Sequence, residues 1–554
     1  MKRNLDRLTN RAFDLLVIGG GIHGAVAAWD AASRGLSVAL IERSDFGSAT
    51  SQNSLKIVHG GLRYLQDGNL SRIRTMARER TTWMRIAPHL VHPLTCLTPT
   101  RQKLSRSRLA LGVALIANDI LSFDRNHQAD LEKRLPGGKI ISQMELGSLL
   151  PDYDVSASTG AAVWHDAQIY NTERLLLEFV HSAVEAGAEV ANYVEAMGFL
   201  KLDDRITGAQ VRDVQSGDVF EIRSRMILNC AGAWVDKVLE NVSIQSSYAT
   251  SVAMNVIVDK VWSGVAAGLP SQPSDGRLPQ ILFFVPWWDA TIIGTWHIPC
   301  NATPDEFSVT REVLQPFIDE INSAHPPLSL TLEDIRHVNW GFLPVNKEDA
   351  NKRQVRLTRD GVIIDHQRKD DINGLISVLG VKYTTARVVA EKAIDLAVSK
   401  LGVKTDKCQT YRIPVNGGKI EDFNSFMQMA KADGSDRLDE ETVEHLVYTY
   451  GSNYKELLTS ITEQPDLAER IDSNSYVTKA EIVHAIRHEM ALTLADLIQR
   501  RTELGSAGIP SFAAMQKCAK IMAGELDWSL EKQTQEIDAV IQRYPIKQME
   551  RVTA

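Results

Sequence analysis

Three glycines and a glutamate near the start of the chain have the types and spacing of a phosphate-binding turn. Gly19, Gly21 and Gly24 form a G-x-G-x-x-G pattern, and Glu42 follows about twenty residues further on. The first glycine permits a tight turn, the second lets backbone amides approach a pyrophosphate, and the third lets a helix pack closely on a strand. A carboxylate at Glu42 can accept hydrogen bonds from both ribose hydroxyls and would repel a 2′-phosphate. The pattern predicts a dinucleotide site that disfavours NADP and leaves FAD and NAD open.

The residues around this turn have the pattern of a strand, a helix and a second strand. Residues 13–18 form an apolar run of strand length, and residues 25–34 are rich in alanine, as expected of a helix. Gly35 ends that helix, and residues 36–41 form a second apolar run that leads directly into Glu42. A βαβ unit of about thirty residues therefore holds the glycine turn.

The composition places this unit in a larger globular protein. The chain has 554 residues, 44% of them hydrophobic and 23% charged, which predicts about two to four domains. The net charge of −8 provides no field that attracts nucleic acid. Residues 1–11 lack the apolar segment of a secretory signal, and five cysteines without metal-ligand spacing fit a reducing compartment. We therefore expect a cytoplasmic protein.

Two later stretches could also approach a cofactor. Gly60 and Gly61 offer backbone without side chains, which is suited to the close approach of a flat ring, although an ordinary turn would look the same. Gly380, Lys382 and Thr384 precede an alanine-rich stretch with helical character. The start of such a helix is a ready anion site, and the alternative is a plain helix cap.

The combined motifs resemble the FAD-dependent glycerol-3-phosphate dehydrogenases, within the superfamily of D-amino-acid and glycine oxidases. The resemblance extends along nearly the whole chain. It rests on these stretches: residues 19–24, 55–65, 225–234, 284–287, 292–295, 380–387, 488–491 and 500–502.

The resemblance implies an α/β protein with FAD as its cofactor. It implies a discontinuous Rossmann-type FAD-binding domain (residues 1–100, 170–240 and 355–410). An α+β substrate-binding region (residues 101–169 and 241–354) would be interleaved with it, followed by an all-helical C-terminal domain (residues 420–554). The residues expected to hold FAD are Gly19, Gly21, Gly24, Glu42, Arg43, Thr50, Ser51, Lys56, Gly60, Gly61, Ala231, Gly232, Gly380, Lys382 and Thr384.

The substrate end of the resemblance is incomplete. Arg63, Tyr64, Arg359 and Lys382 match family residues that hold a small anionic substrate. Four residues depart from the family pattern. Leu343 replaces the arginine of a G-V-R-P-L motif, Asn255 replaces a histidine, and Trp296 with His297 replaces threonine-aspartate. Losing a desolvated arginine removes a charge-assisted contact of about 1.5–3 kcal/mol.

The reaction implied by the resemblance is hydride transfer from a carbinol carbon to flavin N5, which leaves a ketone. With glycerol-3-phosphate the product is dihydroxyacetone phosphate. The reaction needs a general base, for which His297 and His59 are candidates, and a cation such as Lys382 to offset developing charge.

Two other classes of function stay open from the residues. One is a flavoenzyme that oxidises an amine, an amino acid or another hydroxy compound, for which Leu343 would relieve positive charge. The other is an FAD-binding protein without catalysis. His484 and His488 lie one helical turn apart beside Glu489 but lack a third ligand, so we expect no metal.

The resemblance also suggests partners. A basic cluster at residues 101–108 precedes the apolar run 109–117, a pattern that fits either a membrane surface or a solvated loop before a buried helix. Bacterial members of the family are peripheral membrane enzymes that pass electrons to quinone. We expect quinone or oxygen as electron acceptor, peripheral attachment to the inner face of the cytoplasmic membrane, and a homodimer.

Overall fold

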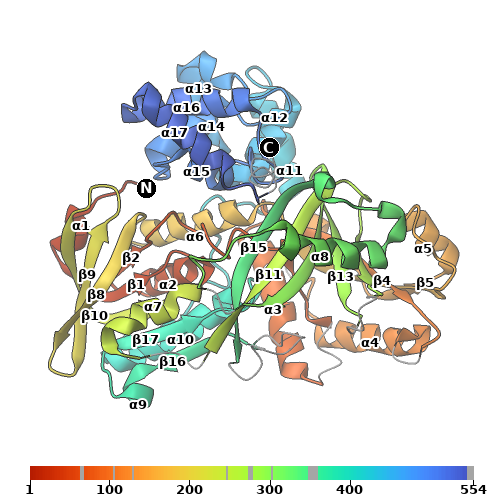
Figure 1. The fold of residues 1–554 in the computed structure, drawn as a ribbon, viewed down its shortest axis with the longest axis horizontal. Coiled ribbons are helices and arrows are strands. Elements are labelled where there is room, and N and C mark those ends of the chain that lie inside the picture. The colour runs from red at the N-terminus through yellow and green to blue at the C-terminus, as the bar shows by residue number, and fades with distance from the viewer. Residues whose placement is uncertain are drawn as a thin grey trace.

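Two β-sheets and a C-terminal group of helices make up the described part of the chain (Figure 1). The computed structural model describes residues 1–62, 68–103, 106–127, 130–244, 248–272, 279–300, 303–346, 358 and 360–545.

The first sheet, of eight strands among the described residues, is parallel at its centre. β1 (Ala12–Ile18) lies between β2 (Val38–Ile41) and β10 (Val219–Asn229), and all three strands run in the same direction. Both faces of the centre are covered, which explains why its strands are continuous apolar runs. The other strands are β7 (Glu189–Ala191), β8 (Val194–Leu202), β9 (Arg205–Asp213), β16 (Val362–Asp365) and β17 (Leu375–Leu379).

Three helices cover one face of this sheet. α2 (Ile22–Ser33) starts directly after the glycine turn and packs against α6 (Thr172–Glu185) and α10 (Ala386–Leu401). The alanines of α2 are buried, and their small side chains allow the helices to approach closely. The predicted βαβ unit and the predicted fold class are confirmed.

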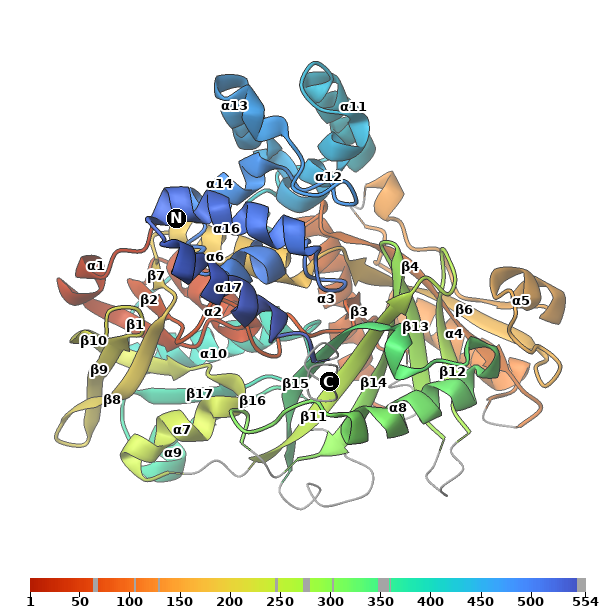
Figure 2. The ribbon, with the colours of Figure 1, turned by 45° about the horizontal axis from the view of Figure 1, so that its top comes forward.

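The second sheet has nine strands within the described residues and runs beside the first (Figure 2). α8 (Arg311–Ala324) covers one face and buries Leu314, Phe317 and Ile321 against it. The strands, in the order in which they pair, are β15 (Ile335–Asn346), β11 (Tyr248–Asp259), β14 (Ala290–Pro299), β13 (Ile281–Trp287), β12 (Ala266–Pro270), β4 (Val91–Thr100), β6 (Gly160–Ile169) and β3 (Ile57–Val58), with β5 (Lys139–Ile141) on β6.

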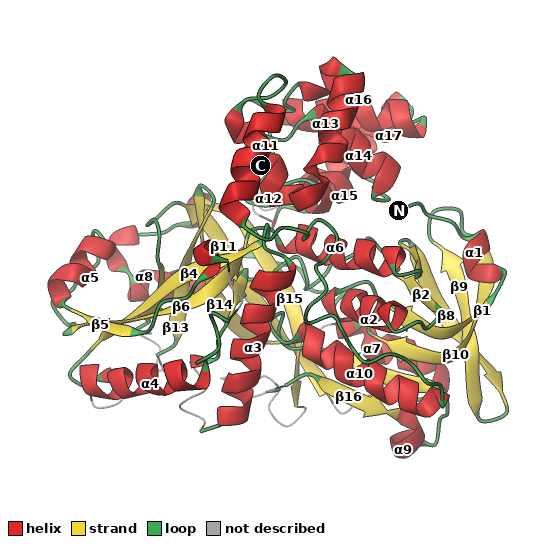
Figure 3. Ribbon diagram, turned by 180° about the vertical axis from the view of Figure 1, so that it is seen from behind, coloured by secondary structure: helices red, strands yellow, loops and turns green. Residues whose placement is uncertain are grey.

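The C-terminal helices sit over α6 (Figures 1 and 3). An ion pair of 2.6 Å between Arg174 of α6 and Glu489 joins the C-terminal helices to the helices that cover the first sheet. The C-terminal helices are α11 (Phe423–Gly434), α12 (Glu440–Tyr450), α13 (Tyr454–Glu463), α14 (Lys479–His488), α15 (Leu494–Asp496), α16 (Phe512–Leu526) and α17 (Leu530–Ile541). The remaining α-helices of the described chain are α1 (Asp6–Thr9), α3 (Leu70–Ile86), α4 (Arg108–Leu121), α5 (Gln143–Leu149), α7 (Val235–Leu239) and α9 (His366–Asp370).

The predicted domain limits stay a prediction. The first sheet gathers strands from several separated segments, as a discontinuous unit requires. β4 pairs in the second sheet, although residues 1–100 are predicted to belong to the FAD-binding domain. Of the helices in the described ranges, none is both long and apolar enough to cross a membrane.

A buried histidine joins two parts of the C-terminal unit. His445 of α12 lies 2.8 Å from a Glu481 oxygen and 3.2 Å from a Glu503 oxygen. Burial alone would lower the pKa of His445, but the two carboxylates raise it well above its usual value. His445 is therefore charged at neutral pH.

We expect His445→Gln to lower the free energy of unfolding, because it leaves two buried carboxylates without their cation, a loss of about 3 kcal/mol. The pKa of His445 is raised on folding, so its contribution is complete below about pH 6.5 and is lost as the pH rises through the folded-state value. The difference in melting temperature between wild type and variant should be larger at pH 6 than at pH 9. The exposed His127 supplies the control His127→Gln, and a pH-independent difference would contradict the assignment.

Candidate functional site

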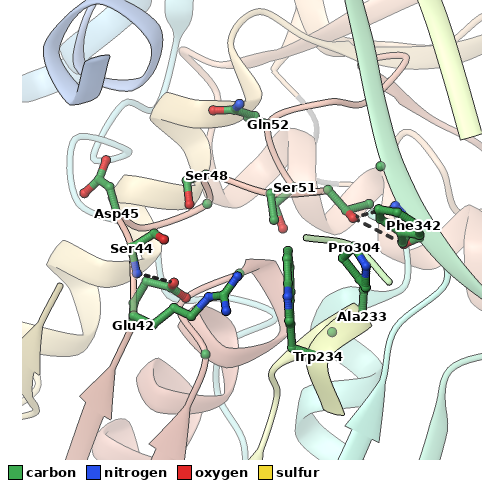
Figure 4. A pocket seen from close by; sticks show the side chains of 18 of the residues that line it. Glu42, Ser44, Asp45, Ser48, Ser51, Gln52, Ala233, Trp234, Pro304 and Phe342 are labelled. Carbon is green, nitrogen blue, oxygen red and sulfur yellow. Dashed lines mark hydrogen bonds between the residues drawn. The ribbon is translucent and has the colours of Figure 1, made fainter. Parts of the chain in front are cut away.

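A cavity of about 560 Å³ lies at the carboxyl ends of β1, β2 and β10. This edge of a parallel sheet is where α/β folds bind nucleotides. Figure 4 shows Glu42 and Asp45 on one side of the cavity, Trp234 below and Phe342 at the far end. The predicted cofactor residues on its wall are Gly19, Gly21, Glu42, Arg43, Thr50, Ser51, Ala231 and Gly232.

The glycine turn has the close contacts that its pattern predicts. Gly19 has a φ of +106°, and a Cβ added there would lie 2.6 Å from the carbonyl oxygen of Cys230. A Cβ at Gly24 would lie 1.9 Å from the carbonyl oxygen of Gly19. The first glycine therefore allows β1 to turn beside β10, and the third allows α2 to pack on the turn.

Polar groups converge on the cavity where a dinucleotide would need them. The carboxylate of Glu42 accepts hydrogen bonds from the amides of Gly20 (2.7 Å) and Ser44 (2.8 Å). Burial raises the pKa of Glu42, and these two amide donors oppose that effect. The hydroxyl of Ser51 accepts from the amide of Ile22 in the first turn of α2 (3.0 Å). The start of α2 is thus already bound to an oxygen, as expected of an anion site.

A second cavity of about 240 Å³ adjoins the first and shares part of its wall, including Gly21, Thr50, Ser51 and Gly232. Its other walls come from β11, β14, β15 and the segment before α10. Of the residues predicted to bind substrate, Asn255, Leu343 and Lys382 meet here, and the predicted cofactor residue Gly380 lies beside them.

Asn255 is held by Thr295, the last residue of the 292–295 motif. The hydroxyl of Thr295 donates a hydrogen bond of 3.0 Å to Oδ1 of Asn255, and both residues line the smaller cavity. This contact fixes the orientation of the Asn255 amide, whose nitrogen can only donate.

A histidine from the glycine motif also lines the smaller cavity. Burial lowers the pKa of His23 to about 4, so its ring is neutral at neutral pH. Nε2 of His23 is buried and has no hydrogen-bond partner in the described part of the protein. A Cβ at Gly380 would lie 1.9 Å from this ring, so Gly380 is needed to make room for His23. The position of His23 inside G-x-G-x-x-G was the available sequence signal.

Besides Gly24, which packs inside the turn, four predicted cofactor residues do not line either cavity. The ammonium group of Lys56 is buried and pairs with Glu173 at 2.9 Å. A Cβ at Gly60 would lie 2.1 Å from the Arg80 guanidinium, and Gly61 packs on α3. The hydroxyl of Thr384 accepts from the amide of His59. These residues support neighbouring protein groups because tertiary partners occupy the space beside them.

Trp296 is a correction to the predicted substrate site. Its ring stacks on Phe317 of α8 with centroids 5.5 Å apart and is buried in the core of the second sheet. Neighbouring side chains on a strand point to opposite faces, so Thr295 faces the cavity and Trp296 faces α8.

The two predicted catalytic histidines are not on the cavity walls. His59 is 41% exposed, with Nδ1 3.8 Å from a carboxylate oxygen of Asp166. His297 is partly buried on β14. Arg63, Tyr64 and Arg359 lie outside the described residues.

This fold and site define a dinucleotide-binding oxidoreductase with a small ligand pocket beside the cofactor cavity. The glycine turn, the Glu42 carboxylate and the amides at the start of α2 fit the adenosine and pyrophosphate of FAD. The smaller cavity continues from there, as a site for the reacting end requires.

Comparisons with known proteins give the family. Residues 14–386 match the FAD dependent oxidoreductase family, and residues 408–533 match the C-terminal domain of alpha-glycerophosphate oxidase. A glycerol-3-phosphate dehydrogenase of Synechocystis is 32% identical over 98% of this chain and 97% of its own length. The Mycobacterium leprae glycerol-3-phosphate dehydrogenase is 31% identical over 96% of this chain and 88% of its own.

The fold has a solved counterpart. The structure of the Bacillus halodurans glycerol-3-phosphate dehydrogenase complexed with FAD matches with a TM-score of 0.76 and 24% identity, over 98% of this chain and 96% of that one. The chain belongs to the FAD-dependent oxidoreductases, in the family of the glycerol-3-phosphate dehydrogenases. The predicted cofactor and enzyme class are confirmed, and the alternatives of amine oxidation or loss of catalysis are not favoured.

We expect Gly24→Ala to abolish or strongly weaken FAD retention, because the new Cβ would meet the Gly19 carbonyl and push α2 from the turn. The measurement is the ratio of flavin to protein absorbance after purification. Gly524 lies in α16 with open space beside it, so Gly524→Ala is the matched control. The Gly524→Ala variant should keep the flavin content of the wild type, and its free energy of unfolding should rise by about 0.5–1 kcal/mol. Normal flavin content in Gly24→Ala would contradict the role of this contact.

Proposed function

We propose that the protein oxidises glycerol-3-phosphate, or a similarly small anionic alcohol, to the ketone. The observation that carries this proposal is the smaller cavity, which holds Lys382, Asn255 and Thr295 and adjoins the cofactor cavity. The names of relatives that match nearly the whole chain support the same substrate. Bound FAD supplies the hydride acceptor.

We propose three roles for residues of the described wall. Lys382 provides a cation for the substrate anion, and the Asn255 amide, oriented by Thr295, can donate to a substrate oxygen. Leu343 contributes an apolar surface where the family pattern has an arginine. Arg63, Tyr64 and Arg359 are proposed to complete the anion site.

The proton acceptor is proposed to be a histidine. His297 and His59 keep that role as predictions, and His23 joins them because it lines the smaller cavity with a ring nitrogen that has no partner among the described residues. A neutral imidazole can accept the hydroxyl proton.

A membrane surface and a quinone are proposed as partners, with oxygen as the alternative acceptor. α4 presents an exposed apolar stripe formed by Leu109, Val113, Ile116 and Ile120, and Leu109 is 80% exposed. These four residues lie on one face at helical spacing, and Arg108 starts the helix. An apolar stripe beside basic residues fits the surface of an anionic bilayer. A homodimer stays a prediction.

Anaerobic addition of glycerol-3-phosphate should bleach the oxidised flavin spectrum, and a quinone analogue should restore it. Lys382→Met should lower kcat/KM by about ten- to a hundredfold through loss of a charge-assisted contact, measured in protein with matched FAD content. Lys392→Met, which removes an exposed lysine of α10, is the control. A flavin spectrum that glycerol-3-phosphate leaves unchanged would overturn the substrate while leaving the cofactor in place.

The double variant Leu109→Asn/Ile116→Asn should reduce sedimentation with phosphatidylglycerol vesicles, because it removes apolar area from the stripe. Leu530→Asn is the control, since Leu530 is 81% exposed on the C-terminal α17. Anaerobic flavin reduction should be unchanged in both variants. Equal sedimentation of wild type and double variant would show that α4 does not bind the membrane.

A further inference from the structure

The C-terminal helical unit forms part of the wall of the cofactor cavity. Arg500 lies in a π-helical turn (Leu497–Arg501) after α15, and Arg543 lies just after α17. Both residues line the same cavity as Gly19 and Glu42. A segment more than four hundred residues from the glycine turn in the sequence therefore borders the predicted position of FAD.

Two arginines of this unit hold the loop that follows Glu42. Asp45 accepts a hydrogen bond of 2.6 Å from Nε of Arg500 and two of 2.7 Å from the guanidinium of Arg501. All three side chains are buried. Burial alone would raise the pKa of Asp45, but the guanidinium groups of Arg501 and Arg500 hold it well below its usual range. Asp45 is thus a fixed anion between the C-terminal unit and the cofactor loop.

Further contacts hold the same wall. Nη1 of Arg500 donates to the side-chain oxygen of Gln52 at 3.3 Å, near the other end of the loop. The hydroxyl of Tyr193 donates to Asp496 at 2.7 Å. Gln52 and Tyr193 both line the cavity. The C-terminal unit therefore positions the cofactor wall at several points.

Arg543 differs from these two arginines because its guanidinium makes no side-chain hydrogen bond or ion pair within the described ranges. It is exposed and lies on the cavity wall. Arg543 shares this wall with Arg500, whose partner Asp45 lies on the same side of the cavity as Glu42 (Figure 4), at the end where Glu42 would hold the ribose. A guanidinium beside that end can stack on an adenine ring or contact a phosphate.

We propose that the C-terminal unit is a working part of the FAD site: Arg543 contacts the adenosine diphosphate half of FAD, and Arg500 with Arg501 are positioning residues that hold the Asp45 loop around it. The proposal concerns the cofactor and is independent of which alcohol is oxidised. It predicts that FAD binding and docking of the C-terminal unit favour each other, as linked equilibria must.

The test of Arg543 is titration of the full-length apoprotein with FAD and with FMN, followed by flavin fluorescence. FMN shares the isoalloxazine ring but lacks the adenosine. Arg543→Ala should raise the dissociation constant for FAD about two- to fivefold and leave that for FMN unchanged. Arg487→Ala is the control, because Arg487 pairs with Glu525 elsewhere in the same unit. Unchanged FAD binding, or an equal loss for both flavins, would overturn the contact.

The positioning role has a separate readout. Saturating FAD should slow proteolysis of the exposed segment that precedes the C-terminal helices, at residues 411–414. Arg500→Met should weaken this protection and FAD affinity together, and Arg500→Lys should restore part of both, because lysine can still pair with Asp45. FAD protection of equal size in wild type and Arg500→Met would overturn the coupling. If Arg500→Met does not fold, the wild-type protein alone still tests the coupling. Proteolysis of the wild type at the same rate with and without FAD would overturn the coupling between FAD binding and docking of the C-terminal unit.

Discussion

The close backbone approach at the glycine turn is the constraint on which the site depends. Gly24 lies so near the Gly19 carbonyl that no side chain fits between them. Because Gly19 also packs against Cys230 at the end of β10, the turn fixes β1, α2 and β10 together. This contact brings the start of α2, the Glu42 carboxylate and the Cys230–Trp234 segment around one cavity. Cofactor binding therefore depends on a backbone distance before it depends on any charged group.

Buried ion pairs fix the parts that the glycine turn does not reach. Lys56 pairs with Glu173, Arg80 with Asp166, and Arg174 with Glu489. Each pair joins segments far apart in the sequence and needs both partners, because an isolated buried charge is strongly destabilising. The Asp45 cluster follows the same rule and links the cofactor loop to the C-terminal unit. Such pairs add little net stability but make one arrangement of the units strongly preferred.

The sequence predicted the parts of the site that local geometry determines. Gly19, Gly24 and Glu42 lie within one βαβ unit, so their spacing in the sequence determines where they lie relative to one another. Lys56 and Gly60 do not line either cavity, because their surroundings depend on Glu173 and Arg80, which no local pattern reveals. Trp296 illustrates a different limit, since a motif alignment marks a position without saying which face of the strand it occupies. Neither the contribution of Arg543 nor the Asp45 cluster could be predicted from the sequence, because both form only when distant segments pack together.

The charge on the described walls of the smaller cavity is uneven, and in the proposed function this orients the anionic substrate. Lys382 lies just before α10, whose first-turn amides receive no cap from the Thr385 side chain, so positive potential from the lysine and the helix start comes from one side. Elsewhere the wall carries Asn255 and Leu343, which are neutral, and Asp236 of α7, whose carboxylate repels an anion. An anionic group is therefore favoured toward α10, with the carbon skeleton toward Leu343. Because Leu343 stands where the family pattern has an arginine, we expect the polar groups of Asn255 and Thr295 to contribute more to the choice of substrate.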